Sequence, residues 1–102
     1  MRVKKLKVEK LLELFPEEVI VRALERELLT KKALYEKRDR EMRKKYGMDF
    51  DRAEKELLNL KGHTWEVERD LAEWEHAVEG IESCKELLKE IEKWKTSSVQ
   101  SR

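Results

Sequence analysis

The sequence predicts an all-α protein: an elongated antiparallel helical hairpin, with a short N-terminal helix and a short connecting helix, that assembles as a dimeric bundle. Charged residues make up 46% of the 102 residues, apolar residues make up 39%, and there are only three Gly and one Pro. This composition is typical of long helices and coiled coils. Pro16, Gly47 and Gly62 divide the chain into four segments. Three of these segments have apolar residues at helical spacing.

The length of the chain, residues 1–102, fits a single helical domain. The net charge is only +1, although residues 1–45 are basic and residues 46–102 are acidic. The single cysteine, Cys84, cannot form an internal disulfide. No apolar stretch approaches the ~20 residues of a membrane span, and the basic N-terminus lacks the apolar centre of a signal peptide. We therefore expect a cytoplasmic protein, with a thermophile-like content of Lys and Glu.

The N-terminal segment, residues 1–15, is the least regular part of the sequence. The stretch "LLELF" indicates a short helix near residues 8–15. The preceding apolar residues follow neither a helical nor a strand period. A basic strand followed by helices would also suit a ribbon-helix-helix DNA-binding protein, but the helix expected after Pro16 is much too long for that fold.

A long helix is predicted over residues 17–46. Glu17 and Glu18 place negative charge at its N-terminus, where the helix dipole favours it. No Gly or Pro interrupts this segment, and an acidic residue repeatedly precedes a basic residue by four positions. Gly47 can adopt the left-handed conformation that ends a helix.

A short connecting helix and a second long helix follow. Asp49 is the predicted N-cap of a helix over residues 50–61, which Gly62 ends. Thr64 is the candidate N-cap of a helix over residues 65–95. The polar residues 96–102, "TSSVQSR", are expected to form a frayed tail.

The second long helix has apolar residues on two sides. Trp65 and Trp74 point in opposite directions, because a helix turns about 100° per residue. Trp74 belongs to the predicted packing seam, which has alternating spacings of four and three residues: Val67, Leu71, Trp74, Val78, Ile81 and Leu88. Trp65 shares the opposite stripe with Ala72, His76, Leu87 and Trp94.

The first long helix is also apolar on two sides before residue 35. Its main stripe is Val21, Leu24, Leu28, Tyr35, Met42 and Tyr46, and off that stripe lie Val19, Ala23, Leu29, Ala33 and Leu34. Antiparallel pairing would place residues 19–34 beside 78–94, and the basic segment 36–45 beside the acidic segment 66–75. A helix that is apolar on two sides packs on two sides, so we predict a homodimer. The candidate dimer-interface or partner-binding residues are Trp65, Leu87, Trp94, Leu29 and Leu34.

Other functions have weaker support in the sequence. Glu73 and His76 have the Glu-x-x-His spacing of ferritin-like di-iron helices, which gives a metal-binding protein or oxidase as the alternative. Both residues point away from the seam, whereas di-iron ligands project into the bundle core, so we expect no metal, no cofactor and no enzymatic activity. A third possibility is a nucleic-acid-binding accessory protein, suggested by the basic residues 2–7 and 37–45. Within the second stretch Asp39 and Glu41 are spaced to pair along the helix.

Two small residues of the second long helix have structural explanations. Cys84 lies at the edge of the packing face and is expected to be a small buried apolar side chain. Gly80, inside the helix, costs about 1 kcal/mol relative to Ala. Either a close approach by a neighbouring helix or simple tolerance would explain it.

One part of the sequence also carries a family resemblance. Residues 36–54, "EKRDREMRKKYGMDFDRAE", followed by residues 63–78, "HTWEVERDLAEWEHAV", resemble small prokaryotic, especially archaeal, antitoxin-like helical proteins of two-gene toxin–antitoxin modules. The matching positions cover about half of the chain: Tyr46, Gly47, Met48, Phe50, Trp65, Glu66, Glu68, Asp70, Trp74 and Glu75. The resemblance implies binding to a toxin-like protein and brings no catalytic residues. We therefore expect a non-enzymatic protein–protein interaction module.

Overall fold

The computed structural model describes residues 10 and 13–97, together with the backbone of residues 98–100. Within these residues the protein is helical and contains no strand, so the all-α class is confirmed. Helix α2 spans Glu17–Tyr46, α3 spans Phe50–Lys61 and α4 spans Trp65–Gln100. The bounds of α2 and α3 are those predicted. Of the short helix predicted near residues 8–15, residues 8, 9, 11 and 12 lie outside the described residues, and residues 10, 13 and 14 are helical.

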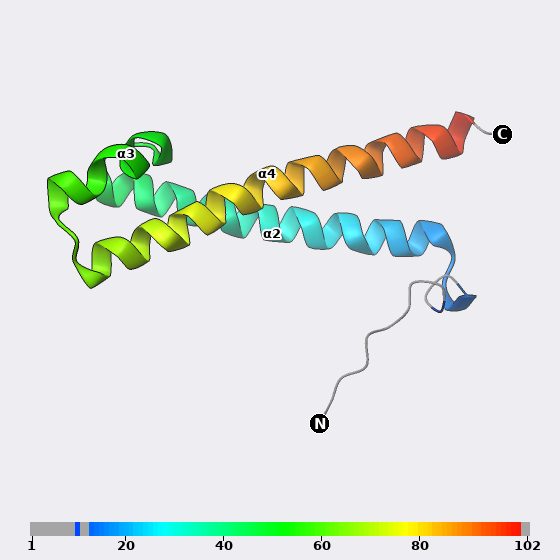
Figure 1. Cartoon of the computed structure of the whole chain (residues 1–102). Coiled ribbons are helices and arrows are strands. Elements are labelled where there is room, and N and C mark those ends of the chain that lie inside the picture. The colour runs from blue at the N-terminus through cyan, green and yellow to red at the C-terminus, as the bar shows by residue number, and fades with distance from the viewer. Residues whose placement is uncertain (1–9, 11–12, 101–102) are drawn as a thin grey trace, which may run out of the picture.

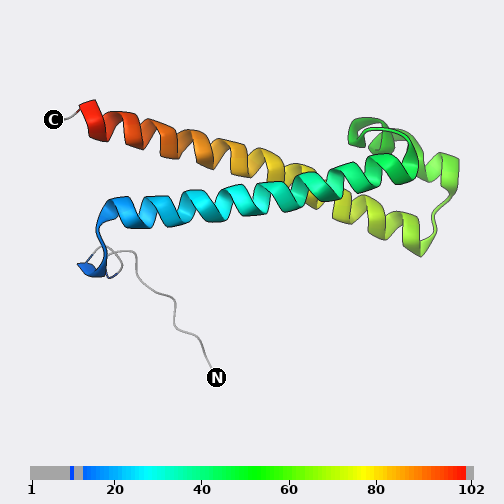
Figure 2. The same cartoon turned by 180° about the vertical axis from the view of Figure 1, so that it is seen from behind.

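The two long helices lie side by side in opposite directions and cross near their middle (Figures 1 and 2). Helix α3 connects them and packs against both at one end. We call this end, residues 36–79, the closed end. The opposite end, formed by residues 13–35 and 80–97, is called the open end.

The turns around α3 are built by the capping residues expected from the sequence. Gly47 follows α2 with φ 68°, and its N–H donates to the carbonyl of Arg43. Asp49 accepts a hydrogen bond from the backbone N–H of Arg52 at 3.0 Å. Thr64 accepts one from the N–H of Val67 at 3.2 Å at the start of α4. The Asp49 and Thr64 side chains satisfy N–H groups that have no partner inside their own helix, and the Gly47 N–H satisfies a carbonyl in the last turn of α2.

Helix α4 ends later than predicted. It reaches Gln100 rather than ending near Lys95, so the helix includes most of the residues expected to form a frayed polar tail. Neither Gly nor Pro follows Gly80 in the sequence. The hydroxyl of Thr96 donates to the carbonyl of Glu92 at 3.0 Å, a bond that a helix can accommodate. Polar composition without a helix-breaking residue therefore does not end this helix.

The core lies at the closed end, around Trp74. The buried cluster comprises Met42, Ala53, Leu57, Val67 and Trp74. The Trp74 ring stacks on Tyr46 at 6.2 Å and meets the Phe50 ring edge-on at 5.6 Å between centroids. Its indole N–H donates to Asp39 at 2.8 Å. The prediction that Trp74 faces the packing seam is confirmed.

The buried face of α4 is wider than the predicted seam, because two helices pack on it. Leu71 and Val78 are only partly buried and pack against the cluster that includes α3. The more deeply buried positions toward α2 include residues that the predicted seam omitted, namely Asp70, Ala77 and Cys84. Asp70, Ala77 and Cys84 lie seven residues apart, which is the repeat of coiled-coil packing. Because these side chains are small or charged, the pattern of large apolar residues in the sequence did not reveal that they face α2.

The open end is much less covered. Among the described residues, no side chain of α2 before Met42 and none of α4 after Cys84 is buried. Leu24, predicted on the main packing stripe of α2, is 54% exposed. Charged residues, Glu25 and Lys32, take half-buried positions along the α2 side of the contact. The two helices are therefore in contact here without forming a sealed core.

Candidate protein-interaction surface

The five predicted interface residues do not form one continuous surface. Four of them are exposed, with exposed fractions of 76% for Trp65, 62% for Leu34, 53% for Leu29 and 51% for Leu87. Trp65 begins α4 at the closed end, whereas Leu29 and Leu87 lie at the open end. Trp94 is half-buried.

Trp94 helps to join the ends of the two long helices. Its indole N–H donates to the Glu17 carboxylate at 2.7 Å. The neighbouring Lys95 donates to both carboxylate oxygens of Glu25, at 3.0 and 2.8 Å, and this hydrogen bonding raises the pKa of Lys95. The structure therefore places Trp94 in contact with α2 and does not bring it together with Trp65.

A shallow groove runs between α2 and α4, with Tyr35, His76 and Gly80 at its centre. The Tyr35 ring lies against Gly80 so closely that a Cβ atom there would be 2.7 Å from Tyr35 Cζ. Close approach thus explains this glycine. His76 meets the same tyrosine edge-on, with ring centroids 5.6 Å apart. Val78 packs toward the core that contains α3, and Gly80 lies about 200° further around α4, so the groove is on the face away from α3.

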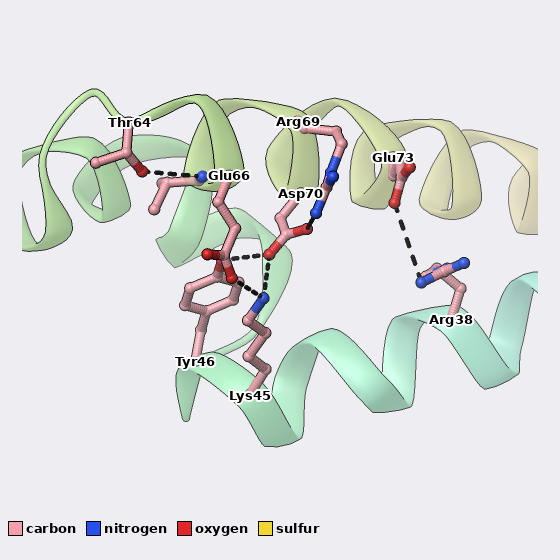
Figure 3. Close-up of polar contacts among 9 residues, drawn as sticks. Arg38, Lys45, Tyr46, Thr64, Glu66, Arg69, Asp70 and Glu73 are labelled. Atoms are coloured by element: carbon pink, nitrogen blue, oxygen red, sulfur yellow. Dashed lines mark hydrogen bonds and ion pairs between the residues drawn. The ribbon is translucent and has the colours of Figure 1, made fainter.

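The groove has an apolar lining and charged edges. Its apolar lining includes Leu24, Leu28, Leu34, Ala72, Ala77 and Leu87. The α2 edge carries Glu27, Lys31 and Arg38, whereas the α4 edge carries Glu73 and Glu79. Arg38 and Glu73 face each other across the two helices at 4.0 Å (Figure 3). In the sequence, a glycine inside a predicted helix, Gly80, was a sign of close packing at this place. The sequence did not show that the Tyr35 ring covers that glycine.

A second apolar hollow adjoins the groove at the open end. Phe15, Val19, Ile20, Ala23 and Leu24 line it. Phe15 and Val19 are each 48% exposed. We call these five residues the open-end patch. Because Leu24 also lines the groove, apolar surface continues from the middle of the hairpin to the start of α2.

A buried carboxylate at the closed end connects α4 to α2 (Figure 3). Asp70 is 3% exposed and accepts hydrogen bonds from Lys45 Nζ at 2.6 Å and from the Tyr46 hydroxyl at 2.5 Å. Lys45 also contacts Glu66 at 2.8 Å. Burial alone would raise the pKa of Asp70, but the hydrogen bonds from Lys45 and Tyr46 outweigh it and lower that pKa.

This cluster supports structure rather than proton transfer. Burial and the hydrogen bond to Asp70 raise the pKa of Tyr46, and the hydrogen bonds to Asp70 and Glu66 raise the pKa of Lys45. Each group is thereby held further in its ordinary charge state at neutral pH. A general acid or base needs a pKa near the working pH instead. The cluster also realises the predicted pairing of the basic segment 36–45 with the acidic segment 66–75.

The alternative metal-binding residues have other neighbours in the structure. Glu73 lies opposite Arg38, and His76 packs against Tyr35. Within the described part of the chain, no group of three or more His, Cys, Asp or Glu side chains is arranged to hold a metal ion. Cys84 is a free, buried thiol, as expected for a small apolar side chain.

Comparison with known proteins supplies no further site. No protein-family model, curated protein or solved structure matches this chain. In residues 13–100 no helix combines the length and the apolar character needed to cross a membrane. The groove and the open-end patch are therefore the features from which a function can be inferred.

Proposed function

We propose that this chain is a non-enzymatic protein-interaction module that forms a homodimer and binds a second, toxin-like protein, which it neutralises. The unequal burial along the hairpin carries the proposal. The closed end encloses Trp74 and Leu57 completely, whereas Leu24, Leu34 and Leu87 at the groove are more than half exposed. Contiguous exposed apolar surface of this kind marks protein-interaction sites.

Two adjoining surfaces support two contacts. The groove is lined by residues 24–38 of α2 and 72–87 of α4, and it suits a helical partner, because packed helices bury apolar residues that recur every three or four positions. The open-end patch is smaller and almost entirely apolar. We assign the groove to the homodimer and the open-end patch to the protein partner. Large apolar side chains such as Phe15 are suitable anchors for such a contact.

The partner contact is tested with the product of the reading frame next to this chain's gene. Co-expression should relieve any growth inhibition by that product, and the two proteins should purify together. Val19→Asp, which puts a charge in the open-end patch, should abolish both effects while the protein remains folded. Leu29→Asp is the matched control, because Leu29 is similarly exposed, at 53% against 48%, and does not line the patch.

The two substitutions distinguish binding through a specific surface from nonspecific binding through any exposed apolar residue. Loss of binding in Val19→Asp alone supports the open-end patch as the partner site. Equal loss in both variants would contradict that assignment. A neighbouring product that neither inhibits growth nor binds this chain would contradict the antitoxin-like function.

A further inference from the structure

The groove between α2 and α4 also indicates how the two copies of the proposed homodimer are arranged. We infer that a second copy of this chain covers the groove, with α2 of each copy lying over α4 of the other. This inference rests on the proposed homodimer and adds its geometry. The groove faces away from α3, so α3 would lie on the outer face of each copy and leave the contact open.

The shape of the groove suits a helix. On the α4 side the small residues Ala72 and Ser83 lie along it, on either side of Gly80, which the Tyr35 ring of the same chain covers. On the other side Leu24 and Leu34 stand exposed. Small residues let a neighbouring helix approach closely, and the leucines of one copy would enter the depression over the small residues of the other. Helix pairs bury side chains in this ridge-into-groove manner.

The charges along the groove select between the two symmetric ways of stacking the hairpins. A twofold axis parallel to the helices places α2 over the partner copy's α4, whereas an axis across them places α2 over α2. The α2 edge has Glu27, Lys31 and Arg38, a net charge of +1, and the α4 edge has Glu73 and Glu79, a net charge of −2. The first arrangement brings edges of opposite net charge together. The second brings edges of like net charge together, which is unfavourable at an interface.

The wider charge distribution favours the same arrangement. Segment 36–45 has six basic and three acidic residues, and segment 66–75 has five acidic and one basic. Stacking about an axis parallel to the helices keeps the two closed ends side by side, so the basic segment of each copy meets the acidic segment of the other. Every neighbouring helix pair is then antiparallel, as in an up-and-down four-helix bundle.

Disulfide trapping tests which helices face each other. In a Cys84→Ala background, Lys31→Cys and Ser83→Cys are introduced into separate, differently tagged chains that are co-expressed. Both residues are exposed and line the groove from opposite helices. After mild oxidation, most of the covalent dimer should join a Lys31→Cys chain to a Ser83→Cys chain. A Leu29→Cys chain is the control and should cross-link little, since it lies outside the groove.

Light scattering on the same proteins distinguishes failure of the geometry from failure of the dimer. A dimer that cross-links mainly through two Lys31→Cys chains or two Ser83→Cys chains would overturn the arrangement and leave the proposed homodimer standing. A monomer at every accessible concentration would overturn both. A groove covered by the N-terminal segment or by another protein would give this monomeric result for the chain alone.

Charge reversal provides an independent measurement. Lys31→Glu changes two symmetry-related pairs in the dimer and should raise its Kd by up to about 30-fold, because each exposed ion pair contributes at most about fivefold. Adding Glu79→Lys should restore the original Kd if the basic edge of one copy faces the acidic edge of the other. A double variant whose dimer Kd is as high as that of Lys31→Glu, or higher, would contradict this pairing.

Discussion

The closed and open ends are built from the same two helices, yet only the closed end has a sealed core. At the closed end, polar groups on the contact have specific partners: Asp39 accepts from Trp74, and Asp70 accepts from Lys45. At the open end, Lys95 pairs with Glu25 and Trp94 donates to Glu17, and none of these four side chains is buried. Apolar residues at helical spacing are therefore not buried to the same extent at the two ends of the hairpin.

The difference comes from the third helix. A pair of helices encloses one stripe on each and leaves the flanks open. Helix α3 covers one flank at the closed end and contributes Ala53 and Leu57, both fully buried. No such cover from the described residues lies over Leu24 or Leu87. The closed end thus holds the hairpin together, and the open end keeps apolar surface available for another chain.

Removing the centre of the closed end should have the largest effect. Trp74→Ala should lower the free energy of unfolding by about 3–5 kcal/mol, because it leaves a large cavity in a packed core. Chemical denaturation measures this change. Trp65→Ala is the matched control: Trp65 is 76% exposed, and its loss should change stability by no more than about 0.5 kcal/mol. A loss under about 1 kcal/mol for Trp74→Ala would show that the closed end does not dominate stability.

The sequence was informative wherever a local rule operates. Gly47, Asp49, Gly62 and Thr64 mark helix ends through their own backbone or side-chain chemistry, so the bounds of α2 and α3 were predictable. Trp74 was identified by apolar spacing. The C-terminus of α4 was not predicted correctly, because residues 96–100 contain neither a strong stop signal nor an apolar pattern.

The candidate surface was predictable only in part. Leu34 and Leu87 are both exposed at the groove, as an interface requires. Asp70 was missed as a buried residue, because its burial depends on Lys45 and Tyr46 from a helix distant in sequence. The groove was also missed, since it depends on how the Tyr35 ring lies against Gly80. Such contacts follow from the tertiary arrangement and leave no periodic signal.

The buried carboxylate should give the next largest effect, at neutral pH. Asp70→Asn should cost about 2 kcal/mol, because hydrogen bonds to a charged group are replaced by weaker ones. The folded-state pKa of Asp70 is lowered, so its contribution is present above the unfolded-state pKa of about 3.9 and is lost as the pH falls through the folded value. The unfolding free energies of the two proteins should therefore converge in acid.

Denaturation curves from neutral pH to pH 3 would measure this convergence. Glu75→Gln is the control, since Glu75 is exposed in the interior of α4, away from the helix ends, and should matter little at any pH. A constant difference between the wild type and Asp70→Asn across this range would contradict the role of the ionised Asp70.

Gly80 lies at the boundary between the two ends and should respond to a single methyl group. Overpacking against Tyr35 costs about 1–3 kcal/mol, while replacing Gly in a helix gains about 1 kcal/mol. Gly80→Ala should therefore be destabilising by about 1 kcal/mol. In a Tyr35→Ala background the clash is gone, and the same substitution should become stabilising. A double-mutant cycle measures this reversal, and an unchanged sign would contradict the close approach.

The smallest effect is expected where Trp94 joins the helix ends. Trp94→Phe retains an aromatic ring but removes the N–H that donates to Glu17. Because the open end has no sealed core, loss of this bond should increase local unfolding there. It should lower the free energy of global unfolding by no more than about 0.5 kcal/mol. Hydrogen exchange should accelerate at the amides of residues 20–24, whereas amides around Trp74 should exchange as before. Glu17→Gln keeps an acceptor oxygen and should show a smaller acceleration. Faster exchange at both ends of the hairpin would mean that they unfold as one unit and that the contrast between them is wrong.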